Sequence, residues 1–208
     1  MKNMKLFVWD FDGTLADTYP KSVGNMQRAL RDFGYDASYV EIMEQMLDNI
    51  GVAVRYFTEK FQILELSDRF DFYYQESRGE PVTLFEDVVD VLRRVQDLGG
   101  VNLIFTNRNE SIFPMLEQAG IANEFAEVVT AIHPNFAWKP APDAILYLME
   151  KFGGTVENTV MIGDRVCDLG SAWNAGCKTC HLLTPVVPQY PPCDWRIQNF
   201  REMLELLN

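Results

Sequence analysis

The chain has 208 residues, 48% of them hydrophobic and 23% charged, which is typical of a globular protein with a sizeable core. Its formal net charge of −12 disfavours general binding to nucleic acid or to an anionic membrane surface. We find no apolar run of membrane-spanning length and no signal peptide in the first eight residues, so we expect a cytoplasmic protein without a membrane partner.

The first expected element is a short apolar strand that ends in two carboxylates. Residues 6–9, Leu-Phe-Val-Trp, are too few for a helix and suit a buried strand. Asp10 and Asp12 follow at once, and then Gly13 and Thr14. Glycine permits a sharp turn and the close approach of a ligand. Because open α/β sheets bind their ligands beyond the carboxyl ends of strands, this stretch is the first candidate site.

The next segment is expected to be entirely helical. We expect helices at about 18–33, 39–47, 52–61 and 67–75. No alternating strand pattern occurs between Ala16 and Arg78. The sequence therefore predicts a helical domain at 16–80, inserted into a core formed by 1–15 and 81–208. An insertion at this point would lie over the site as a lid.

From residue 81 onward, expected strands and helices alternate. The strands are expected at 101–105, 127–132, 159–162 and 179–183, and the helices at 86–98, 111–119, 143–152, 168–175 and 197–207. This alternation predicts an α/β fold with a doubly wound parallel sheet whose strand ends meet at one edge. The proline-rich stretch 185–192 is expected to be a surface loop.

Polar side chains follow several of the expected strands. Thr106 and Asn107 end one strand, Asp164 ends another with Asp168 four residues later, and Lys139 lies in a loop before a helix. Converging carboxylates repel one another unless a cation is present. Three or four hard oxygen ligands suit Mg²⁺, which also pairs with phosphate, while lysine and threonine are natural phosphate ligands. The residues themselves therefore indicate phosphoryl chemistry with Mg²⁺.

Four ordered motifs resemble those of the haloacid dehalogenase-like superfamily. They are Asp10-Phe-Asp12-Gly13-Thr14-Leu15, Thr106-Asn107, Lys139-Pro140 and Gly163-Asp164-Arg-Val-Cys-Asp168. The match spans the whole chain, and the helical insertion resembles the helical cap of that superfamily. The chain is most similar to the phosphoglycolate-phosphatase-like group. Its residues Asn49-Ile50-Gly51 resemble a loop of the cap in that group.

The resemblance implies a Mg²⁺-dependent phosphatase that acts on a small phosphorylated metabolite. Asp10 would be the nucleophile and would form an aspartyl-phosphate. Asp12 would protonate the leaving oxygen and then deprotonate the attacking water. Lys139 would neutralise the phosphoryl oxygens and position Asp10.

The resemblance also implies a set of binding residues. The phosphate would contact Lys139 and four further residues, namely Gly13, Thr14, Thr106 and Asn107. Mg²⁺ would be held by Asp10, by the backbone carbonyl of Asp12 and by Asp164. Asp168 would orient metal-bound water or Lys139 instead of binding the metal directly.

Substrate specificity is expected to reside mainly in the cap. The candidate substrate residues are Tyr19, Asn49, Arg55 and Arg108. Arg108 directly follows the phosphate-binding pair, and a substrate contact and a solvated loop arginine explain it equally well. Phosphoglycolate is the substrate that the resemblance suggests, but a nucleotide monophosphate, a sugar phosphate or pyrophosphate would fit as well.

Several alternatives remain beside this hypothesis. A sugar-phosphate mutase similar to β-phosphoglucomutase would share Asp10 and Asp12. A dehalogenase is disfavoured, because that branch needs no metal and lacks an acid two residues after its nucleophile. A non-catalytic binding protein is disfavoured because the acids, threonine and lysine are all present. Taken singly, Asp164 and Asp168 could also be the N-terminal cap and first-turn acid of a helix.

Two other features of the sequence favour structural interpretations. The spacing Cys177-Lys-Thr-Cys180-His181 matches haem attachment, but this segment suits a strand that follows a helix. We therefore expect neither haem nor a cysteine-bound metal there. Trp138 and Trp173 are expected to be packing residues.

Overall fold

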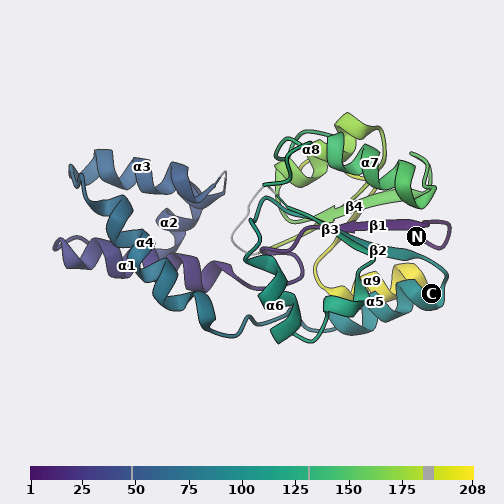
Figure 1. Ribbon diagram of the computed structural model, residues 1–208, viewed down its shortest axis with the longest axis horizontal. Coiled ribbons are helices and arrows are strands. Elements are labelled where there is room, and N and C mark those ends of the chain that lie inside the picture. Colours follow the sequence, from purple (N-terminus) through teal and green to yellow (C-terminus); the bar gives the residue numbers. More distant parts are fainter. Residues whose placement is uncertain (48, 131, 185–189) are drawn as a thin grey trace. The chain divides into compact units, whose positions relative to one another are not determined.

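The structure is a computed structural model that describes residues 1–47, 49–130, 132–184 and 190–208. These residues divide into two compact units (Figure 1). The α/β unit comprises residues 1–17 and 82–208, and the helical unit comprises residues 18–81. Residues 185–189, which include most of the expected proline-rich loop, lie outside the described residues.

The α/β unit is built on a parallel sheet whose described strands run in the order β3-β2-β1-β4-β5-β6. The strands are β1 (Leu6–Trp9), β2 (Val101–Phe105), β3 (Glu127–Val129), β4 (Thr159–Gly163), β5 (Lys178–Leu182) and β6 (Trp195–Ile197). This arrangement confirms the predicted doubly wound α/β fold. The first strand lies in the middle, between β2 and β4, and the chain winds outward from it in both directions.

Helices cover both faces of this sheet (Figure 1). They are α5 (Val88–Asp97), α6 (Ile112–Gln118), α7 (Asp143–Phe152), α8 (Val166–Ala175) and α9 (Phe200–Leu207), with a short 3₁₀ turn, η2 (Ala122–Glu124). Figure 1 shows α7 and α8 on one face and α5, α6 and α9 on the other.

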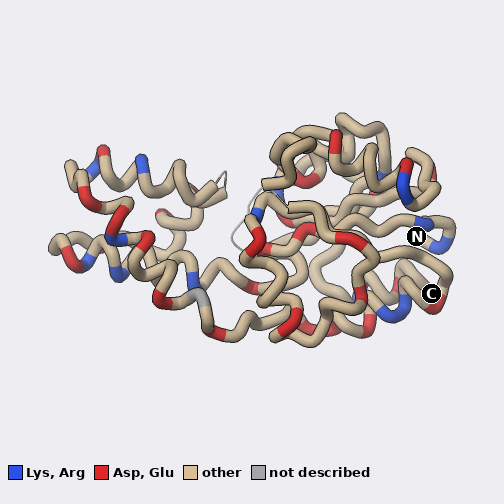
Figure 2. Tube along the Cα trace, in the orientation of Figure 1, with Lys and Arg blue, Asp and Glu red and all other residues tan. Residues whose placement is uncertain are grey.

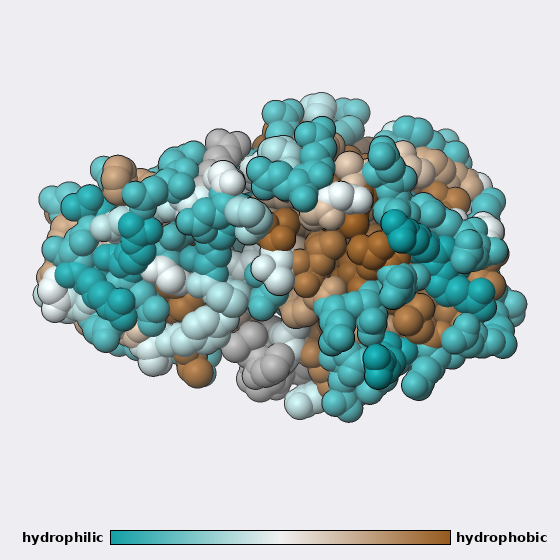
Figure 3. All heavy atoms as spheres, turned by 90° about the horizontal axis from the view of Figure 1, so that it is seen from below, coloured by the Kyte–Doolittle hydropathy of each residue, from teal (hydrophilic) through white to brown (hydrophobic). Residues whose placement is uncertain are grey.

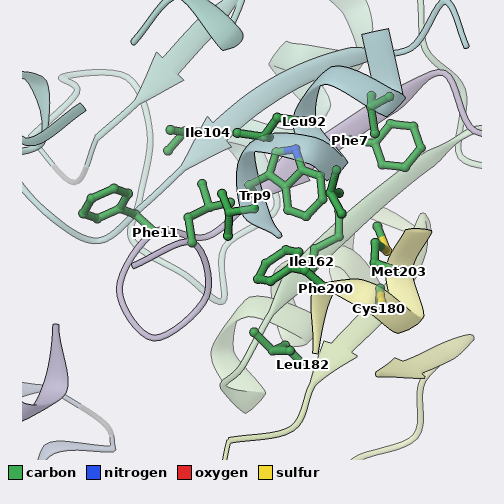
Figure 4. Packing of buried hydrophobic residues seen from close by; sticks show 14 of the residues in the cluster. Phe7, Trp9, Phe11, Leu92, Ile104, Ile162, Cys180, Leu182, Phe200 and Met203 are labelled. Atoms are coloured by element: carbon green, nitrogen blue, oxygen red, sulfur yellow. The ribbon is translucent and has the colours of Figure 1, made fainter. Parts of the chain in front are cut away.

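The side chains of β1 alternate between these two layers, which is why its sequence is apolar throughout. Leu6 and Val8 pack with residues of α7 and α8, whereas Phe7 and Trp9 pack with residues of α5 and α9 (Figure 4). A strand that is buried on both faces has no polar side, as is usual in parallel sheets. Each of these fully buried side chains stabilises the fold by roughly 1.5–3 kcal/mol.

A buried hydrogen-bond chain fixes the end of β1. The indole Nε1 of Trp9 donates to Asn102 Oδ1 at 3.0 Å, and Asn102 Nδ2 donates to the Leu92 carbonyl at 2.8 Å. These bonds join β1, β2 and α5 immediately before the first carboxylate. The backbone at Asp10 therefore starts from a rigid strand end.

The helical unit contains α1 (Tyr19–Asp32), α2 (Tyr39–Met46), α3 (Ile50–Phe61), α4 (Leu66–Glu76) and the 3₁₀ turn η1 (Ser77–Gly79). As predicted, its described residues form no strand. Ser38 and Asn49 cap α2 and α3, because their side chains accept the backbone N–H groups of Glu41 and Val52. Asn25 Nδ2 donates to Ser77 Oγ at 2.8 Å in the interior and ties α1 to η1.

The chain leaves and re-enters the α/β unit at neighbouring positions. The Asp17 N–H donates to the Thr83 carbonyl at 2.9 Å, and the Phe85 N–H donates to the Leu15 carbonyl at 3.1 Å. Ala16 and Leu84 form an antiparallel bridge between these bonds. The insertion therefore begins and ends on a short antiparallel pair within the α/β unit.

The predicted element boundaries are wrong in a few places. Ile197 belongs to β6 and not to the last helix, which begins at Phe200 because the Asn199 side chain accepts the Glu202 N–H as an N-cap. The strand predicted at 127–132 ends at Val129, where a turn brings the His133 N–H to the Thr130 carbonyl at 3.1 Å. Ala131 lies outside the described residues.

Two tryptophans differ from expectation as well. Trp138 is 57% exposed and Trp173 is 42% exposed, so neither is the packing residue that we expected. Trp138 lies in an irregular segment before α7, and Trp173 lies on α8 beside the buried Ala172, which faces the sheet.

On the face that Figure 3 shows, hydrophilic residues predominate in both units, and hydrophobic residues gather in the middle of the α/β unit. Acidic residues outnumber basic ones, 30 to 18, and are spread over both units (Figure 2). Among the described helices, we find none with the length and apolar character that crossing a bilayer requires.

Candidate active site

The candidate site lies at the carboxyl ends of three neighbouring strands. Asp10 follows β1, Thr106 follows β2 and Asp164 follows β4. The pairing register sets Trp9 beside Ile104 on one side and beside Ile162 on the other, so these three ends are level with one another. Lys139 reaches the same place from the loop before α7, and its ammonium bonds there to Asp10.

Lys139 joins two carboxylates in the interior. Its side chain is fully buried, and Nζ donates to Asp10 Oδ1 at 2.5 Å and to Asp168 Oδ1 at 2.7 Å. Burial alone would lower the pKa of Lys139, but Asp10 and Asp168 outweigh it and raise the pKa. The lysine is therefore a fixed positive charge that holds Asp10 in one orientation.

The Asp10 carboxyl group has a raised pKa and one oxygen without a hydrogen-bond donor among the described residues. Burial, followed by repulsion from Asp168, raises the pKa of Asp10 to about 6 despite the opposing effect of Lys139. Its second oxygen, Oδ2, is buried and has no hydrogen-bond partner among the described residues. A buried carboxylate oxygen without a hydrogen-bond donor destabilises the fold, and such an oxygen is well suited to bind a cation.

The surrounding acids fit a metal ion at that oxygen. Asp10, Asp164 and Asp168 each offer a carboxylate oxygen, and these atoms lie within 4.8 Å of one another. All three residues are buried, and Lys139 alone does not balance their charge. An all-oxygen donor set of this kind suits a hard divalent cation such as Mg²⁺.

Asp164 is held by two neighbours. Thr14 Oγ1 donates to Asp164 Oδ1 at 3.1 Å, so the hydroxyl binds an acid of the cluster. His181 on β5 brings Nε2 to 3.0 Å from the Asp164 carbonyl oxygen. Burial lowers the pKa of His181, so the ring is neutral and Nε2 is the nitrogen that carries the proton in this contact.

Asp168 uses both of its oxygens within the protein. Oδ1 accepts from Lys139, and Oδ2 accepts the Arg165 backbone N–H at 2.9 Å, which also caps α8. Burial would raise the pKa of Asp168, but Lys139 and Arg165 outweigh it and lower the pKa. Gly163 makes this approach possible, because a Cβ there would lie 2.3 Å from Asp168 Cβ.

The turn after β1 is closed by its own backbone. Gly13 has a φ of +81°, which favours glycine. Its N–H donates to the Ala16 carbonyl at 2.8 Å, and the Thr14 N–H donates to the Phe11 carbonyl at 3.3 Å. The contact of these two groups with a phosphate stays a prediction.

Thr106 and Asn107 organise the loops around the site. Thr106 Oγ1 accepts the Arg108 backbone N–H at 3.1 Å, and Asn107 Oδ1 accepts the Lys139 backbone N–H at 3.0 Å. Asn107 therefore ties the end of β2 to the loop that delivers the lysine. The binding of a phosphoryl group by these two residues stays a prediction.

Arg108 lies against Asp12. Its Nε donates to Asp12 Oδ2 at 2.9 Å, and its Nη2 donates to Asp12 Oδ1. The arginine side chain is 13% exposed and the aspartate side chain is 19% exposed. The interpretation of Arg108 as a solvated loop arginine is therefore wrong.

The other predicted substrate residues belong to the helical unit. Tyr19 is the first residue of α1, and Arg55 is an exposed residue of α3. Asn49 is the N-cap of α3, with Oδ1 accepting the Val52 N–H at 3.0 Å. The Asn49 side chain thus has a structural role, and substrate contacts by these three residues stay predictions.

Sequence reasoning missed the neighbours that hold the motif residues in place. Ser111, Arg165 and His181 were not singled out for this role, yet they contact Arg108, Asp168 and Asp164 respectively. His181 had a readable signal, because it lies near the end of an expected strand.

The cysteines lie outside the acidic cluster found among the described residues. All four are free thiols. Burial raises the pKa of Cys177 to about 12, and it raises the pKa of Cys180 as well, so both are neutral. His181, the third residue of the haem-like spacing, is engaged with Asp164 instead.

The sequence and the fold are both similar to those of known proteins. The sequence model of the haloacid dehalogenase-like hydrolases matches residues 7–182. A phosphoglycolate phosphatase of Vibrio cholerae is 32% identical over 195 residues, which cover 88% of this chain and 85% of the relative. Another, from Mannheimia succiniciproducens, is 27% identical over 222 residues and covers 98% of both chains. The crystal structure of a predicted phosphoglycolate phosphatase from Haemophilus somnus superimposes with a TM-score of 0.85 over the full length of both chains, at 26% identity.

Proposed function

The chain belongs to the haloacid dehalogenase-like hydrolase family, and from this premise we propose that it is a Mg²⁺-dependent phosphatase of small phosphomonoesters. The reaction would proceed through an aspartyl-phosphate on Asp10. The observation that carries the proposal is the buried Asp10 carboxylate, with one oxygen held by Lys139 and the other without a donor beside two further acids.

The first chemical step forms the phosphoryl-enzyme. Lys139 holds the Asp10 carboxylate, which attacks phosphorus as the bond to the leaving oxygen breaks. Asp12 gives its proton to that leaving oxygen. Because the pKa of Asp10 is about 6, the carboxylate is mostly ionised and nucleophilic at pH 7.

The second step releases phosphate. Asp12 takes a proton from water, the water oxygen attacks phosphorus, and the bond to Asp10 breaks, which restores the Asp10 carboxylate and the protonated Asp12 carboxyl group. Asp168 keeps Lys139 in place throughout. Mg²⁺, held by Asp10, the Asp12 carbonyl and Asp164, would supply the charge that offsets repulsion between the carboxylate and the phosphate.

The names of the relatives support a proposal for the substrate. The curated relatives carry the name phosphoglycolate phosphatase, so phosphoglycolate is the first ester to test. Candidate residues for its recognition remain Arg108 of the α/β unit and Tyr19, Asn49 and Arg55 of the helical unit. We propose that the reaction takes place in the cytoplasm. We expect no nucleic-acid partner, because the net charge is −12.

Phosphate release tests the proposal directly. We expect the protein to release inorganic phosphate from at least one of phosphoglycolate, glucose 1-phosphate, a nucleoside monophosphate, pyrophosphate and p-nitrophenyl phosphate. Release should require MgCl₂ and stop with EDTA. Absence of release, together with a stable phosphoryl label on Asp10, would favour the sugar-phosphate mutase.

We also expect Mg²⁺ to raise the melting temperature, and to raise it more at pH 7 than at pH 5. The pKa of Asp10 is higher in the folded state than its ordinary value of 3.8, so its effect on stability is most favourable below pH 3.8 and is lost as the pH rises through about 6. Mg²⁺ binds the ionised form and relieves this loss. At a hundredfold excess over Kd the gain is about 2.7 kcal/mol, or roughly 5–10 °C.

Differential scanning calorimetry at both pH values, with NaCl matched for ionic strength, measures this effect. A melting temperature that does not respond to MgCl₂ at pH 7 would contradict the metal site.

A further inference from the structure

The contact between Arg108 and Asp12 has a geometry that a chance surface pair lacks. Both oxygens of one carboxylate accept from the same guanidinium, Oδ2 from Nε and Oδ1 from Nη2. A planar fork that meets a planar carboxylate at two points fixes the orientation of the carboxylate as well as its position.

Arg108 is itself anchored from both sides. Its backbone N–H donates to Thr106 Oγ1 at 3.1 Å, and its Nη1 donates to Ser111 Oγ at 3.3 Å. Ser111 is buried at the N-terminus of α6, and its own N–H donates to Asn109 Oδ1 at 3.0 Å. The Arg108 backbone is therefore held at the end of β2 and its guanidinium at the start of α6, and both contacts restrict how Asp12 can move.

The pair is also largely shielded from water, since both side chains are more than four-fifths buried. An exposed ion pair of this kind is weak because solvent screens it and both side chains move. A shielded and doubly bonded pair holds its geometry much better.

We propose that Arg108 is the positioning residue that aims the Asp12 carboxyl group at the leaving oxygen and then at the attacking water, an inference that rests on the proposed function. A two-point hold suits this task, because the release of one of the two bonds would free an oxygen for the proton while the other bond keeps the carboxyl group in place. Arg108 acts through Asp12 and does not touch the reacting atoms. A misplacement of about 1 Å at a catalytic group costs on the order of 10²-fold in rate.

A comparison of two leaving groups tests this role. Phosphoglycolate, or the best alkyl phosphate of the panel, needs a proton from Asp12 to leave, whereas p-nitrophenolate leaves without one. The ratio kcat/KM reports the step in which the leaving group departs. In Arg108→Gln we expect kcat/KM to fall about 10²-fold for the alkyl phosphate and less than about tenfold for p-nitrophenyl phosphate.

Further variants grade the effect. Arg108→Lys should lie between wild type and Arg108→Gln, because an ammonium donates to the carboxylate without the fork. Ser111→Ala removes only the support of the guanidinium and should give a smaller, roughly two- to fivefold, loss in the alkyl ester alone. Arg93→Gln, on the exposed pair with Glu124, is the matched control and should leave both values unchanged.

The outcomes separate the inference from the function on which it rests. Equal losses for both esters in Arg108→Gln would indicate a phosphate contact and overturn the positioning role, and so would the absence of any loss. If Arg108→Gln fails to fold, as judged by circular dichroism, Ser111→Ala decides by the same ratio. A wild-type protein that hydrolyses neither ester with MgCl₂ would refute the proposed function, and the inference with it.

Discussion

Replacement of Asp10 by Asn should abolish phosphate release while leaving the protein folded. An amide cannot attack phosphorus, so hydrolysis should fall by about 10⁴- to 10⁶-fold, as when other enzymes lose their nucleophile. The side chain keeps its size and can still accept from Lys139 through its carbonyl oxygen. It also removes a charge that burial and then repulsion from Asp168 disfavour, so the melting temperature should not fall by more than a few degrees.

The measurement is phosphate release by Asp10→Asn with the best ester of the panel, beside a melting curve. Asp17→Asn is the matched control, because it makes the same chemical change on an exposed carboxylate of the same unit. That variant should retain the wild-type rate within about twofold, as surface substitutions usually do. Retention of more than about 1% of the wild-type rate by Asp10→Asn would contradict the nucleophile assignment.

Replacement of Lys139 by Met should have the largest effect on stability. It leaves Asp10 and Asp168 buried and facing each other without their shared cation. Breaking a buried ion pair by removing one partner costs about 3–5 kcal/mol, which corresponds to a fall of roughly 6–20 °C in melting temperature. Hydrolysis should fall on the order of 10²- to 10³-fold, because a charge that faces the phosphoryl group is lost.

A second substitution distinguishes repulsion from loss of packing. The double variant Lys139→Met with Asp168→Asn lacks one of the two negative charges that repel each other. It should therefore recover a substantial part of the stability that Lys139→Met loses, but not the activity. Lys151→Met serves as the surface control, since its half-exposed pair with Glu127 contributes at most about 1 kcal/mol. Urea unfolding of the three variants gives the comparison. A double variant no more stable than Lys139→Met would show that carboxylate repulsion is not the cause.

The sheet and its site edge could be predicted because their signals are local. The run at 6–9 is apolar and short, and it ends in acids, which defines both a buried strand and the point where the chain leaves the sheet. The strands that end at Phe105 and Gly163 are likewise short and mostly apolar, and polar site residues follow them, Thr106 after one and Asp164 after the other. Parallel pairing then brings these ends together without any further information.

The last strand could not be found in the same way. Residues 195–197 are only three in number, and Ile197 continues the apolar spacing of Phe200, Met203 and Leu207. The helical spacing therefore assigned Ile197 to the last helix. The capping signal of Asn199 with Glu202 three positions later would have given the true start of α9.

Side-chain partners across the site were beyond sequence reasoning for a different reason. Arg108 and Asp12 are 96 positions apart, and nothing local determines that the guanidinium turns toward this acid. Asn107 and Lys139, 32 positions apart, are a second example. Residue types at strand ends predict which chemistry gathers at a site, whereas the pairing among them depends on how the loops are folded.

The central position of β1 has a consequence for how the chain folds during synthesis. Leu6 pairs with Val101 on one side and with Thr159 on the other, so the strand made first has no neighbour until much later residues leave the ribosome. At about 5–20 residues per second, roughly eight to thirty seconds separate Leu6 from its second partner. Meanwhile the helices of residues 18–81 can form from contacts close in sequence, which form quickly. The apolar run Leu-Phe-Val-Trp is therefore the segment of the nascent chain most in need of protection from aggregation.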